Sequence, residues 1–176
     1  MSSNPTDTVY GLGVSVRDCK TPACLFNIKQ RSEQKPIAWL VEGPKSLQIY
    51  GAGVPAYAMQ LSNKFWPGPL TLVVNASLNV PLAYANKNGT IGLRMPANSV
   101  AQNLIRKLGC PIATTSANIS GNKSVKSHSQ LDDCLLQKVS VALCDGKDKE
   151  KSGIASTVVL CTGLQPKVLR QGEIFI

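Results

Sequence analysis

The sequence predicts an α/β protein built on a mixed β-sheet. Short apolar segments that suit buried strands, at 37–41, 70–74 and 112–115, alternate with amphipathic segments that suit helices. Glycine and proline separate these segments, most clearly at 67–69. The length of 176 residues suits one domain, and no repeat or interdomain linker interrupts it, so we treat the whole chain as a single domain.

Two helices are predicted in the first half of the chain. The first spans 21–29, where Thr21 can cap the helix and Pro22 fits its first turn. The second spans 56–65 and ends before the prolines that follow. Between them, residues 43–55 are predicted to form a turn-rich connection.

The second half contains the clearest periodic patterns. Residues 91–95 alternate, with apolar side chains on one face and Arg94 on the other. Residues 100–108 carry an apolar stripe of helical period, and Gly109 supplies a C-terminal stop. The remaining expectations are an irregular segment at 75–89, a helix at 130–138, and strands at 139–144, 157–161 and 168–169.

The opening stretch 4–13, NPTDTVYGLG, is too polar for a core strand and too rich in small residues for a helix. Gly11 and Gly13 permit backbone angles that a side chain would forbid. We therefore expect a shaped turn that presents its polar side chains, Thr6, Asp7, Thr8 and Tyr10. Taken alone, such a loop is more often structural than functional.

The charge balance favours an anionic partner. Nineteen lysines and arginines oppose ten acidic residues, giving a net charge of +9, which suits a nucleotide, RNA or both. Aromatic residues make up only 5% of the chain, which weakens the case for a platform that stacks single-stranded bases. The charged loop 147–152 is predicted to be solvated rather than to form a site.

The six cysteines and one histidine show no zinc-ligand spacing, so we predict no metal site. Cys24, Cys134, Cys144 and Cys161 lie in apolar stretches, where reduced cysteines act as small hydrophobic residues. No signal-peptide pattern or long apolar run is present. We therefore expect a cytoplasmic protein without a membrane partner.

Two pairs of residues could hold phosphate. Lys29 and Arg31 can form a clamp if the helix ends between them, although a lysine in the last turn also simply complements the helix dipole. Ser116 and Asn118 follow a strand and point the same way at a spacing of two, although both are also ordinary turn formers. No Walker A or dinucleotide-binding motif is present, so any nucleotide must be bound by scattered residues.

Seven segments occur in an order that resembles the YrdC-like family, whose members are threonylcarbamoyl-adenylate synthases. They cover essentially the whole chain, and each is weak alone. They are PTDTVYGLG at 5–13, K-x-R at 29–31, FWPGPLT at 65–71, R-x-P at 94–96, ATTSANISG at 113–121, STVV at 156–159 and LRQG at 169–172.

The resemblance implies a twisted mixed sheet with flanking helices around a large, open, basic cavity. It implies condensation of L-threonine, bicarbonate (or CO2) and ATP, with Mg²⁺, to threonylcarbamoyl-adenylate and pyrophosphate. A partner transferase complex would then modify tRNA.

The resemblance also implies the roles of individual residues. Lys29, Arg31, Ser116 and Asn118 form the catalytic phosphate-binding set. The ATP-binding residues are Arg31, Lys35, Thr90, Ser116, Ser124 and Arg170, and the threonine-binding residues are Thr8, Arg94, Thr114 and Ser156. Thr6, Asp7 and Tyr10 would shape the threonine pocket.

Two departures from the family and two alternative functions remain. The chain lacks the helix and strand that precede PTDTVYG in the family, which would leave a sheet edge bare. Leu40 stands where some members have a histidine. One alternative is a double-stranded RNA-binding, ribosome-maturation factor without synthase activity. The other is a module like that of hydrogenase maturation, which sits in a much longer chain with zinc-finger and acylphosphatase parts.

Overall fold

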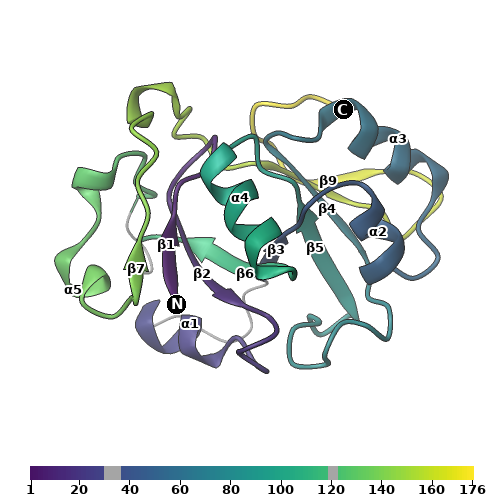
Figure 1. The fold of residues 1–176 in the computed structure, drawn as a ribbon. Helices are drawn as coiled ribbons and strands as arrows, with labels where there is room; N and C mark the ends of the chain where they lie inside the picture. The colour runs from purple at the N-terminus through teal and green to yellow at the C-terminus, as the bar shows by residue number, and fades with distance from the viewer. Residues whose placement is uncertain (30–36, 119–122) are drawn as a thin grey trace.

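The predicted mixed α/β architecture is confirmed by the computed structural model, which describes residues 1–29, 37–118 and 123–176 (Figure 1). Its strands are β1 Ser2–Asn4, β2 Gly11–Ser15, β3 Ala38–Leu40, β4 Leu70–Asn75, β5 Thr90–Arg94, β6 Ile112–Ser116, β7 Val141–Ala142, β8 Thr157–Leu160 and β9 Lys167–Arg170. Its α-helices are α1 Ala23–Lys29, α2 Lys45–Tyr50, α3 Ala56–Phe65, α4 Ser99–Leu108 and α5 Asp133–Leu136. Among the described residues, no helix has both the length and the apolar composition needed to span a bilayer.

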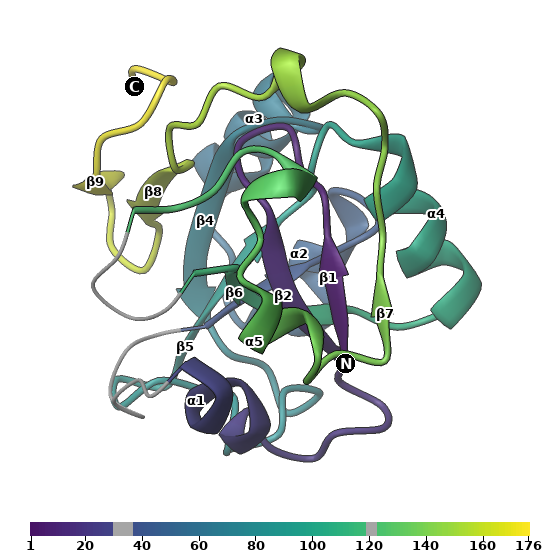
Figure 2. The ribbon, with the colours of Figure 1, turned by 90° about the vertical axis from the view of Figure 1, so that its left-hand side faces the viewer.

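The described strands form one twisted sheet in the order β7-β1-β2-β6-β3-β5-β4-β8-β9 (Figure 2). The sheet is mixed, because β3 runs parallel to β5 and β4 parallel to β8, whereas β6 is antiparallel to both β2 and β3. Strands that are distant in sequence therefore become neighbours. The opening segment lies beside the segment around residue 115, and β3 lies at the centre with β5 next to it.

Several predicted elements differ from the observed ones. The connection 43–55 contains α2, which the turn-forming residues around it concealed. The predicted helix at 130–138 is reduced to α5, preceded by a short 3₁₀ turn, and the strand at 139–144 is reduced to β7. The helices at 56–65 and 100–108 are confirmed, and Gly109 ends α4 in the left-handed conformation.

The stretch 4–13 is not one continuous turn. Its last three residues begin β2, and neither Gly11 nor Gly13 has a positive φ. These glycines are needed for space instead, since a Cβ at Gly11 would lie 2.7 Å from Thr114 Oγ1 and one at Gly13 would lie 2.5 Å from Ile112 Cγ2. The sequence pattern identified the glycines but assigned the wrong physical reason to them.

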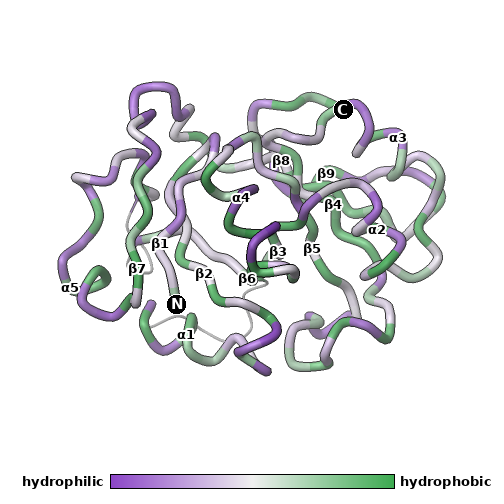
Figure 3. The backbone as a smooth tube through the Cα atoms, in the orientation of Figure 1, coloured by the Kyte–Doolittle hydropathy of each residue, from purple (hydrophilic) through white to green (hydrophobic). Residues whose placement is uncertain are grey.

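The hydrophobic core occupies one face of the central strands. Trp39, Leu72, Ile91 and Leu93 are buried there, and the helices α2 and α3 add Leu47 and Ala58. Apolar stretches run along β4 and β5 (Figure 3). A smaller cluster joins Leu40 and Ile112 of the sheet to α4. The intervening residues of the central strands point the other way, which leaves room for a cavity on that side.

Two of the four cysteines expected in apolar surroundings are exposed. Cys161 is buried and Cys24 is half-buried, whereas Cys134 and Cys144 face solvent. All six cysteines are free thiols.

The first strand carries buried polar groups that lack partners. The Ser3 hydroxyl and both polar atoms of the Asn4 amide find no hydrogen-bond partner among the described residues, although both residues are buried. β1 lies between β2 and β7, so its position is internal to the sheet rather than at an edge. Because a buried unpaired amide costs free energy, β1 is a weak point of the fold.

We predict that Asn4→Leu stabilises the protein. Leucine has nearly the shape of asparagine, so the change removes an unpaired amide and retains the packing, which should raise the free energy of unfolding by about 1–3 kcal/mol. Urea denaturation measures this quantity. Asn75→Leu, at the exposed end of β4, is the matched control and should have little effect. Equal or lower stability of the Asn4 variant would contradict the interpretation.

Candidate active site

A cavity of about 430 Å³ lies against the polar side of the sheet. Strands β2 to β6, β8 and β9 contribute to its wall, together with the opening loop, α1 and the segment 83–87. Its lining joins the first ten residues of the chain to Leu169 and Arg170. Residues from most of the sequence therefore line one cavity.

The period of the strands explains why the lining is small or polar. Thr90, Gly92 and Arg94 alternate along β5 with the core residues Ile91 and Leu93, and all three line the cavity. The neighbouring strands repeat this pattern and supply Thr71, Val73, Thr114, Ser116 and Val158. One face of these strands therefore contributes mainly to the main core, while the other contributes mainly to the site.

Arg94 is buried in the wall of the cavity and held by three contacts. Its Nε donates to the Gly68 carbonyl at 3.1 Å, one terminal nitrogen donates to Thr8 Oγ1 at 3.0 Å, and the other reaches Asp7 Oδ1 at 2.6 Å. Burial lowers the pKa of Arg94 from its ordinary value, while the Asp7 carboxylate opposes that shift. An arginine remains charged under these conditions, so a fixed cation faces the cavity.

Thr8 and Asp7 are themselves fixed by the opening loop. Thr6 Oγ1 contacts Thr8 Oγ1 at 3.0 Å and accepts hydrogen bonds from the backbone N–H groups of Thr8 and Val9. Asp7 Oδ1 also accepts a hydrogen bond from the Ala97 backbone at 3.1 Å. The turn predicted from the sequence thus shapes the surroundings of Arg94.

Ser156 and Arg170 form another part of the wall. The Arg170 guanidinium donates to the Ser156 carbonyl at 2.8 and 3.0 Å and to Ser156 Oγ at 3.2 Å. Ser156 Oγ also contacts Thr71 Oγ1 at 2.9 Å. Partial burial lowers the pKa of Arg170, which nevertheless stays a cation at neutral pH.

Lys29, Ser116 and Asn118 come together although 87 residues separate the first two. Lys29 Nζ lies 3.1 Å from Ser116 Oγ and 3.0 Å from Asn118 Oδ1, and it also donates to the Ser116 carbonyl. Ser116 Oγ donates to Asn118 Oδ1 at 2.5 Å. The last residue of α1 is thereby tied to the turn that follows β6.

The remaining predicted residues occupy different parts of the cavity. Thr90 Oγ1 accepts a hydrogen bond from Asn86 Nδ2 at 2.5 Å, which fixes the segment beside Lys87. Thr114 Oγ1 donates to the Leu12 carbonyl at 3.0 Å. Leu40 also contributes to the lining, at the position where some relatives were expected to carry a histidine.

The structure therefore brings most of the predicted site residues together. Eight of them line the cavity: Thr8, Thr90, Arg94, Thr114, Ser116, Ser124, Ser156 and Arg170. Lys29 and Asn118 are absent from the lining and act on it through Ser116. Arg31 and Lys35 lie outside the described residues, so their predicted contacts with ATP stay predictions, as does the basic character of the cavity.

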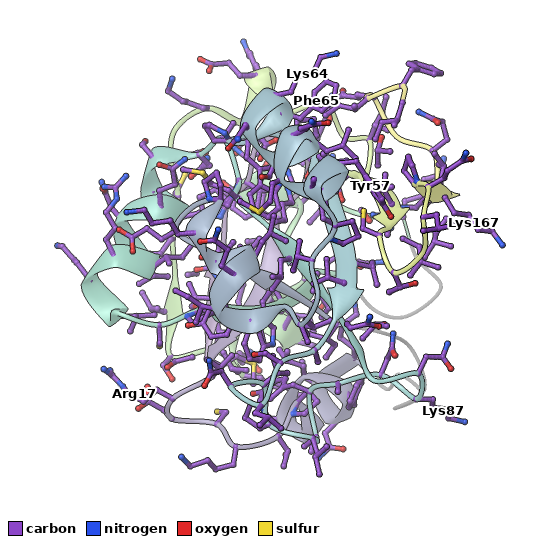
Figure 4. All side chains as sticks on the ribbon, turned by 90° about the vertical axis from the view of Figure 1, so that its right-hand side faces the viewer. Arg17, Tyr57, Lys64, Phe65, Lys87 and Lys167 are labelled. Carbon is purple, nitrogen blue, oxygen red and sulfur yellow. The ribbon has the colours of Figure 1, made fainter. Side chains whose placement is uncertain are left out.

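Sequence reasoning did not assign roles to several lining residues. Thr71 contacts Ser156, Asn86 holds Thr90, and Phe26 and Tyr84 add aromatic surface. Thr71 ends the FWPGPLT segment, so its place in a motif was a usable signal. No comparable pattern marks Tyr84 or Asn86. Lys87 also contributes to the lining, and Figure 4 shows its side chain projecting outward from the molecule.

Comparison with known proteins gives this cavity a family context. The sequence model of the Sua5/YciO/YrdC family, described as "Telomere recombination", matches residues 3–172. The chain belongs to this family. The expected resemblance to YrdC-like proteins is thus confirmed.

Individual members of the Sua5/YciO/YrdC family match nearly the whole chain. A Mycobacterium tuberculosis relative is 37% identical over 170 residues, which are 97% of this chain and 77% of that protein. A Pyrococcus abyssi protein named threonylcarbamoyl-AMP synthase is 35% identical over 96% of this chain, and this chain spans about half of its length, 49%. The structure of P. abyssi Sua5 complexed with L-threonine superposes with a TM-score of 0.89 at 35% identity, covering 97% of this chain and 50% of that one.

We predict that Gly11→Ala distorts the cavity wall. The new Cβ would meet Thr114 Oγ1 at 2.7 Å, so the hydroxyl that lines the cavity must move, and the overpacking should cost about 1–3 kcal/mol of unfolding free energy. Gly43→Ala is the control, since its Cβ would meet nothing within 4 Å. Urea denaturation of the two variants checks the difference. Equal stability of the two variants would show that the cavity wall accommodates a methyl group at Gly11 without cost.

Proposed function

We propose that this chain forms threonylcarbamoyl-AMP and pyrophosphate from L-threonine, bicarbonate or CO2, and ATP. The observation that carries the proposal is that residues of both predicted binding sets line one cavity. Thr8 and Arg94 of the threonine set line the same cavity as Ser116 and Arg170 of the ATP set. The P. abyssi relative whose structure contains L-threonine supports the amino-acid assignment.

Arg94 is the proposed anchor for the carboxylate of threonine. Its contacts to Gly68, Thr8 and Asp7 use three of the five N–H groups of a guanidinium. The remaining N–H groups can bind a carboxylate, and the fixed orientation lowers the entropy cost of doing so. The hydroxyls of Thr8, Thr114 and Ser156 would complete this pocket.

The proposed reaction requires positioning and charge neutralisation more than a protein nucleophile. The neutral threonine amine adds to CO2 and loses a proton to water, which gives a carbamate whose oxygen attacks the α-phosphorus of ATP. The bond from that phosphorus to the bridging oxygen then breaks, and pyrophosphate leaves. Arg170, with the set of Lys29, Ser116 and Asn118, supplies cationic and polar groups suited to the phosphates.

Magnesium would enter with ATP as part of the substrate. The described residues contain no group of three or more histidines, cysteines or carboxylates that could hold a metal ion. This suits a Mg²⁺ ion held mainly by phosphate oxygens and water. We further propose that the product serves tRNA modification through a downstream transferase complex, in the cytoplasm.

The test is pyrophosphate release from purified protein supplied with ATP, Mg²⁺ and bicarbonate, with and without L-threonine. We expect release that depends on threonine. An equimolar amount of an amino acid without a side-chain hydroxyl, such as L-valine, is the control. Failure to release pyrophosphate would refute the synthase assignment. RNA binding that falls steeply with salt in the same preparation would then favour the RNA-binding alternative.

We predict that Arg170→Ala weakens ATP binding by about 1.5–3 kcal/mol, the contribution of a hydrogen bond to a charged group. Isothermal titration calorimetry measures this loss. Lys167→Ala removes a cation from the same strand, and its exposed side chain projects away from the molecule (Figure 4). The control should bind ATP normally. Equal ATP affinities of the two variants would show that Arg170 does not contribute to ATP binding.

A further inference from the structure

A buried ion pair lies behind the opening loop, outside the cavity lining. Lys151 Nζ is 2.7 Å from each oxygen of Asp145, and both side chains are only 2% exposed. The same ammonium lies 3.7 Å from Asp148 Oδ1 and 5.1 Å from the centre of the Tyr10 ring. The prediction of a solvated loop at 147–152 is therefore wrong for Lys151, although it holds for the exposed Lys147–Glu150 pair.

Stability alone does not account for such a pair. Burying two charges carries a desolvation cost that often equals or exceeds their attraction, and apolar residues of similar volume can replace them without loss. A buried pair of this kind does fix geometry, because each partner has few positions in which its charge is satisfied. The contacts around the pair indicate which geometry is fixed.

The acidic partners connect three separate segments. Asp145 Oδ2 accepts a hydrogen bond at 2.6 Å from Asn98 Nδ2. The side-chain oxygen of Asn98, Oδ1, caps α4 by accepting a hydrogen bond from the Ala101 backbone. Asp148 accepts hydrogen bonds at 2.9 Å from the Tyr10 hydroxyl and from the His128 backbone. Burial, together with the hydrogen bond to Asp148, raises the pKa of Tyr10, so its hydroxyl stays a neutral donor.

The residues that follow Lys151 reach the opening loop directly. The backbone N–H of Ser152 donates to the Asp7 carbonyl at 3.3 Å, and that of Gly153 donates to the Thr8 carbonyl at 2.9 Å. The side chains of Asp7 and Thr8 in turn hold the Arg94 guanidinium. A continuous chain of contacts therefore runs from the buried ammonium to the cation that faces the cavity.

We propose that Lys151 is a positioning residue for the amino-acid end of the cavity. Its pair with Asp145 holds the loop 145–153 in place, this loop fixes the backbone of Asp7 and Thr8, and these two residues orient Arg94 for a carboxylate ligand. The identity of that ligand as L-threonine rests on the proposed function. The network also touches the His128 backbone, in the segment that follows Ser124, but the route through Asp7 and Thr8 ends at Arg94. We therefore expect the main effect of Lys151 on the amino-acid ligand rather than on ATP.

The test compares Lys151→Met with Lys147→Met in two measurements. Calorimetric titration should show that Lys151→Met weakens L-threonine binding about tenfold or more, since small misplacements of a binding group have effects of this size. ATP affinity should stay close to that of the wild type. Lys147→Met removes an exposed cation from the same loop and should leave both affinities unchanged. Parallel losses of threonine and ATP affinity, or no loss of either, would overturn the proposal.

Hydrogen exchange of the backbone amides at 6–11 gives a second readout that needs no ligand. Exchange there should be faster in Lys151→Met than in the wild type or in Lys147→Met, because the loop loses its support. Unchanged exchange would overturn the positioning role. Absence of threonine binding by the wild type would instead refute the proposed function, and the exchange measurement would still decide whether Lys151 positions the loop.

A paired variant keeps the proposal testable if Lys151→Met leaves the Asp145 carboxylate without a charged partner and the protein fails to fold. Asp145→Asn combined with Lys151→Met removes both charges together, so no buried carboxylate lacks a partner. The double variant should fold and still bind threonine weakly. Restored wild-type affinity in the double variant would show that the ion pair has no positioning role.

Discussion

The contact between Arg94 and Asp7 is the interaction on which the arrangement of the site depends. It joins the opening loop to the inner strand β5 across 87 residues of sequence, and it does so with little access to water. A guanidinium in such a place must be supplied with acceptors from every side. The surrounding backbone therefore has to adopt one shape, in which Gly68, Thr8 and Asp7 all reach the same side chain.

This requirement also explains the two-sided character of the sheet. A strand in contact with the core on both faces would leave no place for a hydrated ligand. Here the alternation along β5 separates Ile91 and Leu93 from Thr90 and Arg94, so one strand contributes to stability and to the site at once. The cavity is thus a consequence of the side-chain period, and it requires no separate domain.

The sequence predicted those features that a local pattern encodes. The helix at 56–65 and the alternation at 91–95 were correct because apolar period and turn residues mark them directly. The strand β2 was missed because two of its residues are glycines, whose role depends on how closely Thr114 and Ile112 approach from another part of the chain. Most of the site residues lie in the seven ordered motifs, and their convergence in space could not be seen from any one motif.

Lys147 and Lys151 show where sequence reasoning ends. Both lysines belong to one short run of charges, and no local pattern distinguishes them. One forms an exposed pair with Glu150, whereas the other is buried against Asp145 and the Tyr10 ring. The difference arises from tertiary contacts, because the residues after Lys151 must reach the carbonyl groups of Asp7 and Thr8. A charge that the fold takes out of water at such cost is best explained by the geometry that it imposes on its neighbours.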